Sequence, residues 1–156
     1  MSVLRRAVPA VVLALGTVLG GGGGAVAVAP EADVAHHGYV TLWQGRVGVA
    51  LLSENHGPSS LPGSTVRLEF SAPPAAGQEL PAGCLWGGDR VVLCGTGALR
   101  AAGAAHRLDL ELRTAGEPEE LTVMVDTAWN GGATDRNPGN HRHEVLVIAT
   151  GDPYVF

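Results

Sequence analysis

The 156-residue sequence predicts an all-β fold, an antiparallel β-sandwich of about seven to eight short strands. Two observations favour this class. Apolar and polar residues alternate with a period of two in several segments, and glycine, proline or asparagine separates these segments at regular intervals. No segment shows a convincing helical period, although residues 95–106 leave room for one helical turn.

The first 27 residues have the features of a secretory signal peptide. Arg5 and Arg6 precede an apolar run over residues 7–19, and Ala25-Val26-Ala27 provides a small-residue cleavage site. An uncleaved membrane anchor is the alternative, but it needs about 20 consecutive apolar residues. The glycines at 20–24 interrupt the run before that length, so we expect a secreted, extracellular or cell-wall-associated protein.

The remainder has the length of one domain and an acidic composition. We expect a flexible N-terminal segment over residues 28–38 and a single sandwich domain over residues 39–156. The sequence has no lysine, and removal of the leader leaves eight arginines against fifteen acidic residues, a net charge of about −7. This charge argues against nucleic acid and against anionic membrane surfaces as partners.

Each predicted strand follows from its own pattern. In residues 64–71, Val66, Leu68 and Phe70 alternate with Arg67 and Glu69, which predicts one buried face and one exposed face. The same alternation or a β-rich composition predicts further strands at residues 39–43, 46–54, 107–113, 121–129 and 143–150. Residues 72–77 and 130–142 are rich in turn formers and are expected to be loops.

The two cysteines, Cys84 and Cys94, bracket a predicted hairpin. Gly87-Gly88-Asp89 favours the turn, and a bulge or an odd-numbered turn would place the cysteines opposite each other. One structural disulfide in an oxidising compartment is the favoured interpretation. A redox pair is the alternative, but reactive pairs are usually spaced C-x-x-C at a helix N-terminus.

Four motifs follow one another in the chain: Asn55-His56-Gly57-Pro58-Ser59, Leu80-Pro81-Ala82-Gly83-Cys84, Val91-Val92-Leu93-Cys94-Gly95-Thr96-Gly97-Ala98-Leu99 with Ala102-Gly103, and Thr134-Asp135-Arg136-Asn137-Pro138-Gly139-Asn140. In this order they resemble the bacterial immunoglobulin-like conserved repeat of secreted proteins, a domain family of unknown function. The resemblance covers residues 40–149 and implies an immunoglobulin-like sandwich without catalytic residues. His141 stands where the family often has asparagine.

The tryptophans are candidate contact residues. Trp86 lies at the hairpin tip, where it either packs over the disulfide or is exposed, and Trp129 opens a glycine-rich loop. An exposed pair would suit stacking on sugar rings or on a partner protein. For Trp43 and Trp129 we favour a place in the core.

The loop before the last strand carries candidate metal ligands. Asp135, Asn137 and Asn140 offer alternating oxygen donors for Ca²⁺, but an Asx-rich turn is the favoured interpretation. His141 and His143 are two residues apart and suit Zn²⁺ or Cu²⁺ if they lie on one strand face, with His36 and His37 as further candidate donors. The spacing defines no third ligand.

The sequence gives no support to catalysis. It has no G-x-S-x-G elbow and no H-E-x-x-H helix, and its glycine run lies in the leader. We therefore predict a non-catalytic secreted or cell-envelope interaction or structural domain without a cofactor, whose partner is a cell-wall polymer or an extracellular protein. The alternative is a small secreted metal-binding protein.

Overall fold

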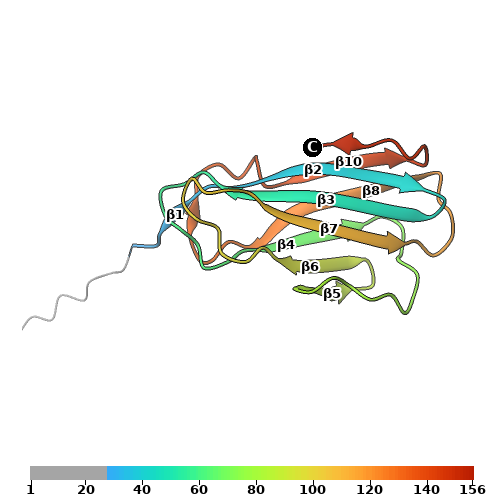
Figure 1. The fold of residues 1–156 in the computed structure, drawn as a ribbon, viewed down its shortest axis with the longest axis horizontal. Coiled ribbons are helices and arrows are strands. Elements are labelled where there is room, and N and C mark those ends of the chain that lie inside the picture. The colour runs from blue at the N-terminus through green and yellow to red at the C-terminus, as the bar shows by residue number, and fades with distance from the viewer. Residues whose placement is uncertain (1–27) are drawn as a thin grey trace, which may run out of the picture.

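The structure, a computed structural model, describes residues 28–156 and is a β-sandwich (Figure 1). The predicted signal peptide lies outside the described residues. One sheet has four antiparallel strands, in the order β11 (Tyr154–Val155), β2 (Val34–Trp43), β3 (Arg46–Asn55) and β7 (His106–Arg113). The other has five, in the order β10 (His143–Ile148), β8 (Glu120–Trp129), β4 (Thr65–Phe70), β6 (Val91–Gly95) and β5 (Cys84–Gly88).

A two-stranded parallel pair, β1 (Glu31–Ala32) with β9 (Thr134–Asp135), completes the strands. The all-β prediction is confirmed: in residues 28–156, eight strands have five residues or more, and the other three have two residues each. None of these residues belongs to a helix long and apolar enough to cross a membrane.

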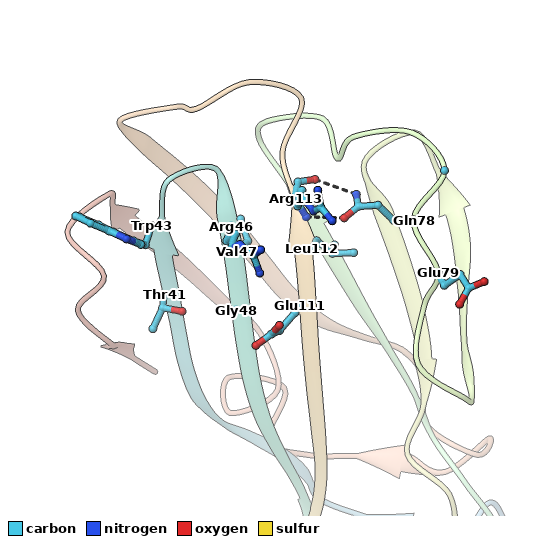
Figure 2. A pocket seen from close by; sticks show the side chains of 11 residues that line it. Thr41, Trp43, Arg46, Val47, Gly48, Gln78, Glu79, Glu111, Leu112 and Arg113 are labelled. Atoms are coloured by element: carbon cyan, nitrogen blue, oxygen red, sulfur yellow. Dashed lines mark hydrogen bonds between the residues drawn. The ribbon is translucent and has the colours of Figure 1, made fainter.

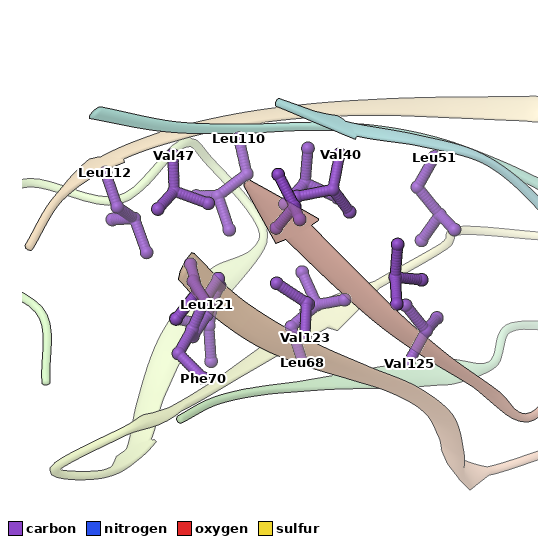
Figure 3. Close-up of a cluster of buried hydrophobic side chains, with 14 of the residues drawn as sticks. Val40, Val47, Leu51, Leu68, Phe70, Leu110, Leu112, Leu121, Val123 and Val125 are labelled. Carbon is purple, nitrogen blue, oxygen red and sulfur yellow. The ribbon is translucent and has the colours of Figure 1, made fainter. Parts of the chain in front are cut away.

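The core lies between the two sheets and is built by the predicted alternation. Inward-facing aliphatic side chains and Phe70 are almost fully buried, and their burial stabilises the fold by roughly 1.5 to 3 kcal/mol for each large side chain. Figure 3 shows the two layers meeting: Val40, Val47, Leu51, Leu110 and Leu112 face Leu68, Phe70, Leu121, Val123 and Val125.

A two-residue turn sets the register of the β2–β3 hairpin. Gln44 and Gly45 both have positive φ angles, 47° and 69°, which is the conformation of a type I′ turn. The turn places Trp43 directly opposite Arg46. This pair lies at the edge of the site described below.

The disulfide prediction is confirmed. Cys84 and Cys94 are direct partners across β5 and β6, with their Cα atoms 4.1 Å apart, and they are bonded to each other. The register shifts between Trp86 and Gly88, so a bulge supplies the offset that brings the cysteines opposite. A disulfide of this kind is compatible with an extracellular protein.

The N-terminal segment differs from the expectation. Residues 28–38 were expected to be flexible, yet β1 and the first five residues of β2 lie within them, and Ala32, Val34 and His36 are buried. A small second cluster explains this, because Ala32 and Val34 pack with Leu61 and Leu99 at one end of the sandwich. The ordered domain therefore begins before residue 39.

Asn55 organises the same end of the sandwich. Its side-chain oxygen accepts hydrogen bonds from the backbone N–H groups of Asp33 and Gly57 at 3.2 and 3.0 Å, and its amide nitrogen donates to the carbonyl oxygen of Ser59 at 2.8 Å. Gly57 approaches Ala32 so closely that a Cβ atom there would lie 2.5 Å from the Ala32 Cα. The Asn55-x-Gly57 motif is thus required by local hydrogen bonding and close packing.

Candidate functional site

A groove of about 460 Å³ opens on the outer face of the four-stranded sheet, at the end where β2 and β3 are joined (Figure 2). Two smaller hollows, of about 210 and 110 Å³, lie elsewhere on the molecule. The groove is lined by side chains of β2, β3 and β7 and by residues 77–79 of the loop that precedes β5.

The groove residues form two rows across the sheet. Arg46 is the register partner of both Trp43 and Arg113, so these three side chains make the first row. Gly48 is likewise opposite Thr41 and Glu111, which make the second row. Successive strand residues point to opposite faces, and all these residues are outside because their neighbours Leu42, Val47 and Leu112 are buried.

Trp43 forms one wall of the groove. The residue is 52% exposed, although part of its ring packs over the turn at Gly151, where a Cβ atom would lie 3.7 Å from the Trp43 Cε3 atom. Gly48 keeps the floor low, since a Cβ atom there would lie 2.7 Å from the Thr41 Oγ1 atom. An aromatic face therefore stands beside a polar floor.

Two arginines stand side by side in the groove without acidic partners. Arg46 and Arg113 are directly opposite across β3 and β7, so their Cβ atoms are about 4.5 to 5.5 Å apart. Within residues 28–156, neither guanidinium forms an ion pair. Arg67 and Arg107, in contrast, each contact a carboxylate on the same strand at 2.7 Å.

Hydrogen bonds to backbone groups hold the walls of the groove in place. The Gln78 side chain pairs with the backbone of edge residue Arg113: Arg113 N–H donates to Gln78 Oε1 at 2.5 Å, and Gln78 Nε2 donates to the Arg113 carbonyl at 2.9 Å. At the hairpin end, the Thr114 N–H donates to the Gly45 carbonyl at 2.8 Å. A site built on such tied strands is preorganised, which lowers the entropic cost of binding.

The structure corrects the placement of the tryptophans. Trp43 and Trp129 were expected in the core, but they are 52% and 51% exposed. Trp43 lies on the outward face of β2, whereas alternation in β8 would bury position 129 and a register shift between Thr65 and Val66 turns Trp129 outward. Trp86, 39% exposed, lies on the edge strand β5. The predicted binding pair, Trp86 and Trp129, is separated by roughly 17 Å, since three strand spacings and three residues lie between them.

The predicted calcium loop is an Asx-rich turn. Asp135 accepts hydrogen bonds from the N–H groups of Asn137 and Val34, at 2.8 and 3.1 Å, and thereby ties the loop to β2. The Asn140 side-chain amide donates to an Asp33 carboxylate oxygen at 2.7 Å. The Asn140 Oδ1 atom, in contrast, is buried without a hydrogen-bond partner.

The candidate histidines gather near one another but do not form a ligand set. The His141 Nδ1 atom lies 3.6 Å from an Asp126 carboxylate oxygen, whereas His143 Nε2 is hydrogen bonded to the Asn140 carbonyl at 3.1 Å. No group of three or more His, Cys, Asp or Glu side chains in residues 28–156 is arranged to hold a metal ion.

His36 is a structural histidine that joins the two sheets. It is fully buried, with Nδ1 3.0 Å from the Ser53 hydroxyl and Nε2 2.8 Å from the Thr127 hydroxyl of the opposite sheet. Burial, followed by the nearby charges of His141, His143 and His37, lowers the pKa of His36 to about 3. The ring is therefore neutral at physiological pH.

The sequence analysis did not predict the charged groove residues as site residues, among them Arg46, Glu111 and Arg113. The Gln44-Gly45 turn was a usable signal for the Trp43–Arg46 pair, because it defines a two-residue hairpin. No local signal exists for Arg113, whose strand pairs with β3 across more than fifty intervening residues. Searches among family models, curated proteins and solved structures found no match to this chain.

Proposed function

We propose that this chain is a non-catalytic, secreted recognition domain that binds a cell-wall polymer in the Trp43 groove. The observation that carries the proposal is Trp43 itself, a half-exposed tryptophan at the wall of an ordered polar groove. Exposed aromatic rings of this kind stack on the apolar faces of sugar rings, while neighbouring polar groups select the hydroxyl pattern.

The composition of the groove supports a binding role over a catalytic one. Its lining contains no serine, cysteine or histidine to act as a nucleophile or as a base near neutral pH. Glu79 and Glu111 are present, but they stand on opposite sides of the groove and their carboxylates do not face each other (Figure 2). Paired-carboxylate hydrolysis needs both acids on one scissile bond.

The leader sequence and the disulfide support export of the domain. The resemblance to immunoglobulin-like repeats of secreted proteins agrees with this role, because such sandwiches present binding surfaces on a rigid scaffold. A metal-binding role has less support, because no group of three or more His, Cys, Asp or Glu side chains in residues 28–156 is arranged to hold a metal ion. The buried Asn140 Oδ1 and His141 Nδ1 atoms nevertheless have no hydrogen-bond partner.

The test is co-sedimentation of the oxidised 28–156 protein with isolated bacterial cell walls, with and without EDTA. We expect saturable binding that Trp43→Ala abolishes and that Trp129→Ala, an equally exposed tryptophan at the other end of the sandwich, leaves unchanged. Gly48→Leu fills the groove floor and should abolish binding as well.

No pelleting under any condition, or equal binding by the Trp43→Ala variant, would overturn the proposal. Loss of binding in EDTA would replace it with the metal-dependent alternative. Circular dichroism of each variant shows whether the sandwich is intact.

A further inference from the structure

We infer that the ligand of the groove is an anionic saccharide, whose carboxylate or phosphate is held between Arg46 and Arg113 while its ring stacks on Trp43. This inference rests on the proposed function and adds the chemical class of the ligand. It comes from the pair of arginines that stand opposite each other in the groove.

The groove brings together two arginines that form no ion pair within residues 28–156, although Glu79 and Glu111 in its lining balance their formal charge. Residues 28–156 carry a net charge of about −7, yet two of the eight arginines stand directly opposite each other on one sheet face. Like charges directly opposite on neighbouring strands destabilise a sheet. A bound anion removes this repulsion, so the pair is explained by a negatively charged ligand.

The row geometry matches two neighbouring sugar units. Neighbouring strands are about 4.8 Å apart, so the row from Trp43 through Arg46 to Arg113 spans roughly 10 Å. A ring at Trp43 leaves the charged group of the next unit within reach of Arg46 and Arg113. Guanidinium groups bind carboxylates and phosphates through two parallel hydrogen bonds, which gives both strength and orientation.

The second row supplies groups for the uncharged part of a sugar. Thr41 offers a hydroxyl and Glu111 a carboxylate, and Gly48 leaves the space between them open. Both groups can hydrogen bond to sugar hydroxyls.

The test is a titration of the 28–156 protein by calorimetry with three probes: oligogalacturonate, its fully methyl-esterified form and a glycerol phosphate oligomer. The methyl ester has the same rings without the charge. We expect binding of at least one anionic probe, weaker binding at higher salt, and no binding of the methyl ester. The two anionic probes distinguish a carboxylate source from a phosphate source.

The variants Arg46→Gln and Arg113→Gln should each weaken binding of the anionic probe and of cell walls roughly tenfold or more. Arg67→Gln is the matched control, because it removes the same charge from the outer face of the other sheet. Equal binding of the methyl ester, or equal wall binding by Arg46→Gln, Arg113→Gln and Arg67→Gln, would overturn the inference.

These outcomes are separable from those of the proposed function. Wall binding that needs Trp43 but neither arginine would leave the recognition role standing and refute the anionic ligand. If the Trp43→Ala variant still binds both the cell walls and the probes, the proposed function and the anionic ligand are both refuted.

Discussion

Arg46 and Arg113 are direct partners across strands β3 and β7, and in the described part of the chain no carboxylate forms an ion pair with either of them. The two guanidinium groups are exposed on a face that also carries Trp43. A fold that keeps such a pair retains a small instability at its binding site, as is common where function and stability conflict.

Removing one charge of the pair should therefore stabilise the protein. We expect Arg113→Gln to raise the free energy of unfolding by about 0.2 to 1 kcal/mol at low salt, because repulsion across the strands is relieved. Urea denaturation measures the change. Arg67→Gln, which breaks the pair with Glu69, should give no such increase. Equal effects of the two variants would contradict the account.

Reduction of the disulfide should destabilise the sandwich but spare the groove. The bond closes a short loop, for which the chain-entropy model predicts roughly 2 to 3 kcal/mol. Unfolding of a Cys84→Ser and Cys94→Ser double variant measures this cost. β5 and β6 belong to the other sheet, and Gln78 of the loop before β5 is held in the groove by the Arg113 backbone, so ligand binding should survive below the unfolding transition. An unchanged denaturation midpoint would contradict this prediction.

His36 should make stability depend on pH. Its pKa of about 3 lies below the ordinary value of 6.5, so the unfolded chain binds the proton more readily than the folded protein. The contribution of neutral His36 to the free energy of unfolding is present above pH 6.5 and is lost as the pH falls toward 3. The free energy of unfolding changes by at most about 1.4 kcal/mol per pH unit on this account. His141, His143 and His37 lower this pKa further by repulsion.

The measurement is the free energy of unfolding between pH 7 and pH 4 for the native chain and for His36→Gln. The variant should be less stable at pH 7, and the difference should shrink as the solution becomes acidic. Two parallel curves would show that His36 does not titrate in this way.

Asn55→Ala should be among the most destabilising single changes at the loop end of the sandwich. The substitution leaves the buried Gly57 N–H and Ser59 carbonyl without their partner, and each unsatisfied group costs about 1 to 3 kcal/mol. Thermal unfolding measures the effect, with the exposed Asn137→Ala as the control. A loss no larger than that of the control would contradict the structural role of Asn55.

Much of the fold could be predicted from local pattern. Alternation in residues 64–71 correctly marks β4, and the two cysteines correctly mark the β5–β6 hairpin. The beginning of β2 was missed because Ala35, His36 and His37 do not alternate in polarity, and His36 is buried only because Ser53 and Thr127 meet its ring. That burial is a tertiary effect without a local signal.

The candidate site was harder to predict from the sequence than the fold. Trp43 was expected in the core, whereas it lies on the outer face of β2, directly opposite Arg46 beside the turn at Gln44 and Gly45. Arg113 joins the site only through the β3–β7 pairing. Residue type alone therefore indicated Trp86 and Trp129 as the binding residues, whereas the strand pairing of the structure indicates Trp43.

The most direct test of the account is to map the ligand contact by amide chemical-shift perturbation, using the isotope-labelled 28–156 protein and soluble cell-wall fragments. We expect the shifted amides to cluster at residues 41–48 and 111–113, with the Trp43 indole N–H among them. Shifts confined to the surroundings of Trp86, of Trp129 or of the 135–143 loop would contradict the claim that the Trp43 groove is the binding site.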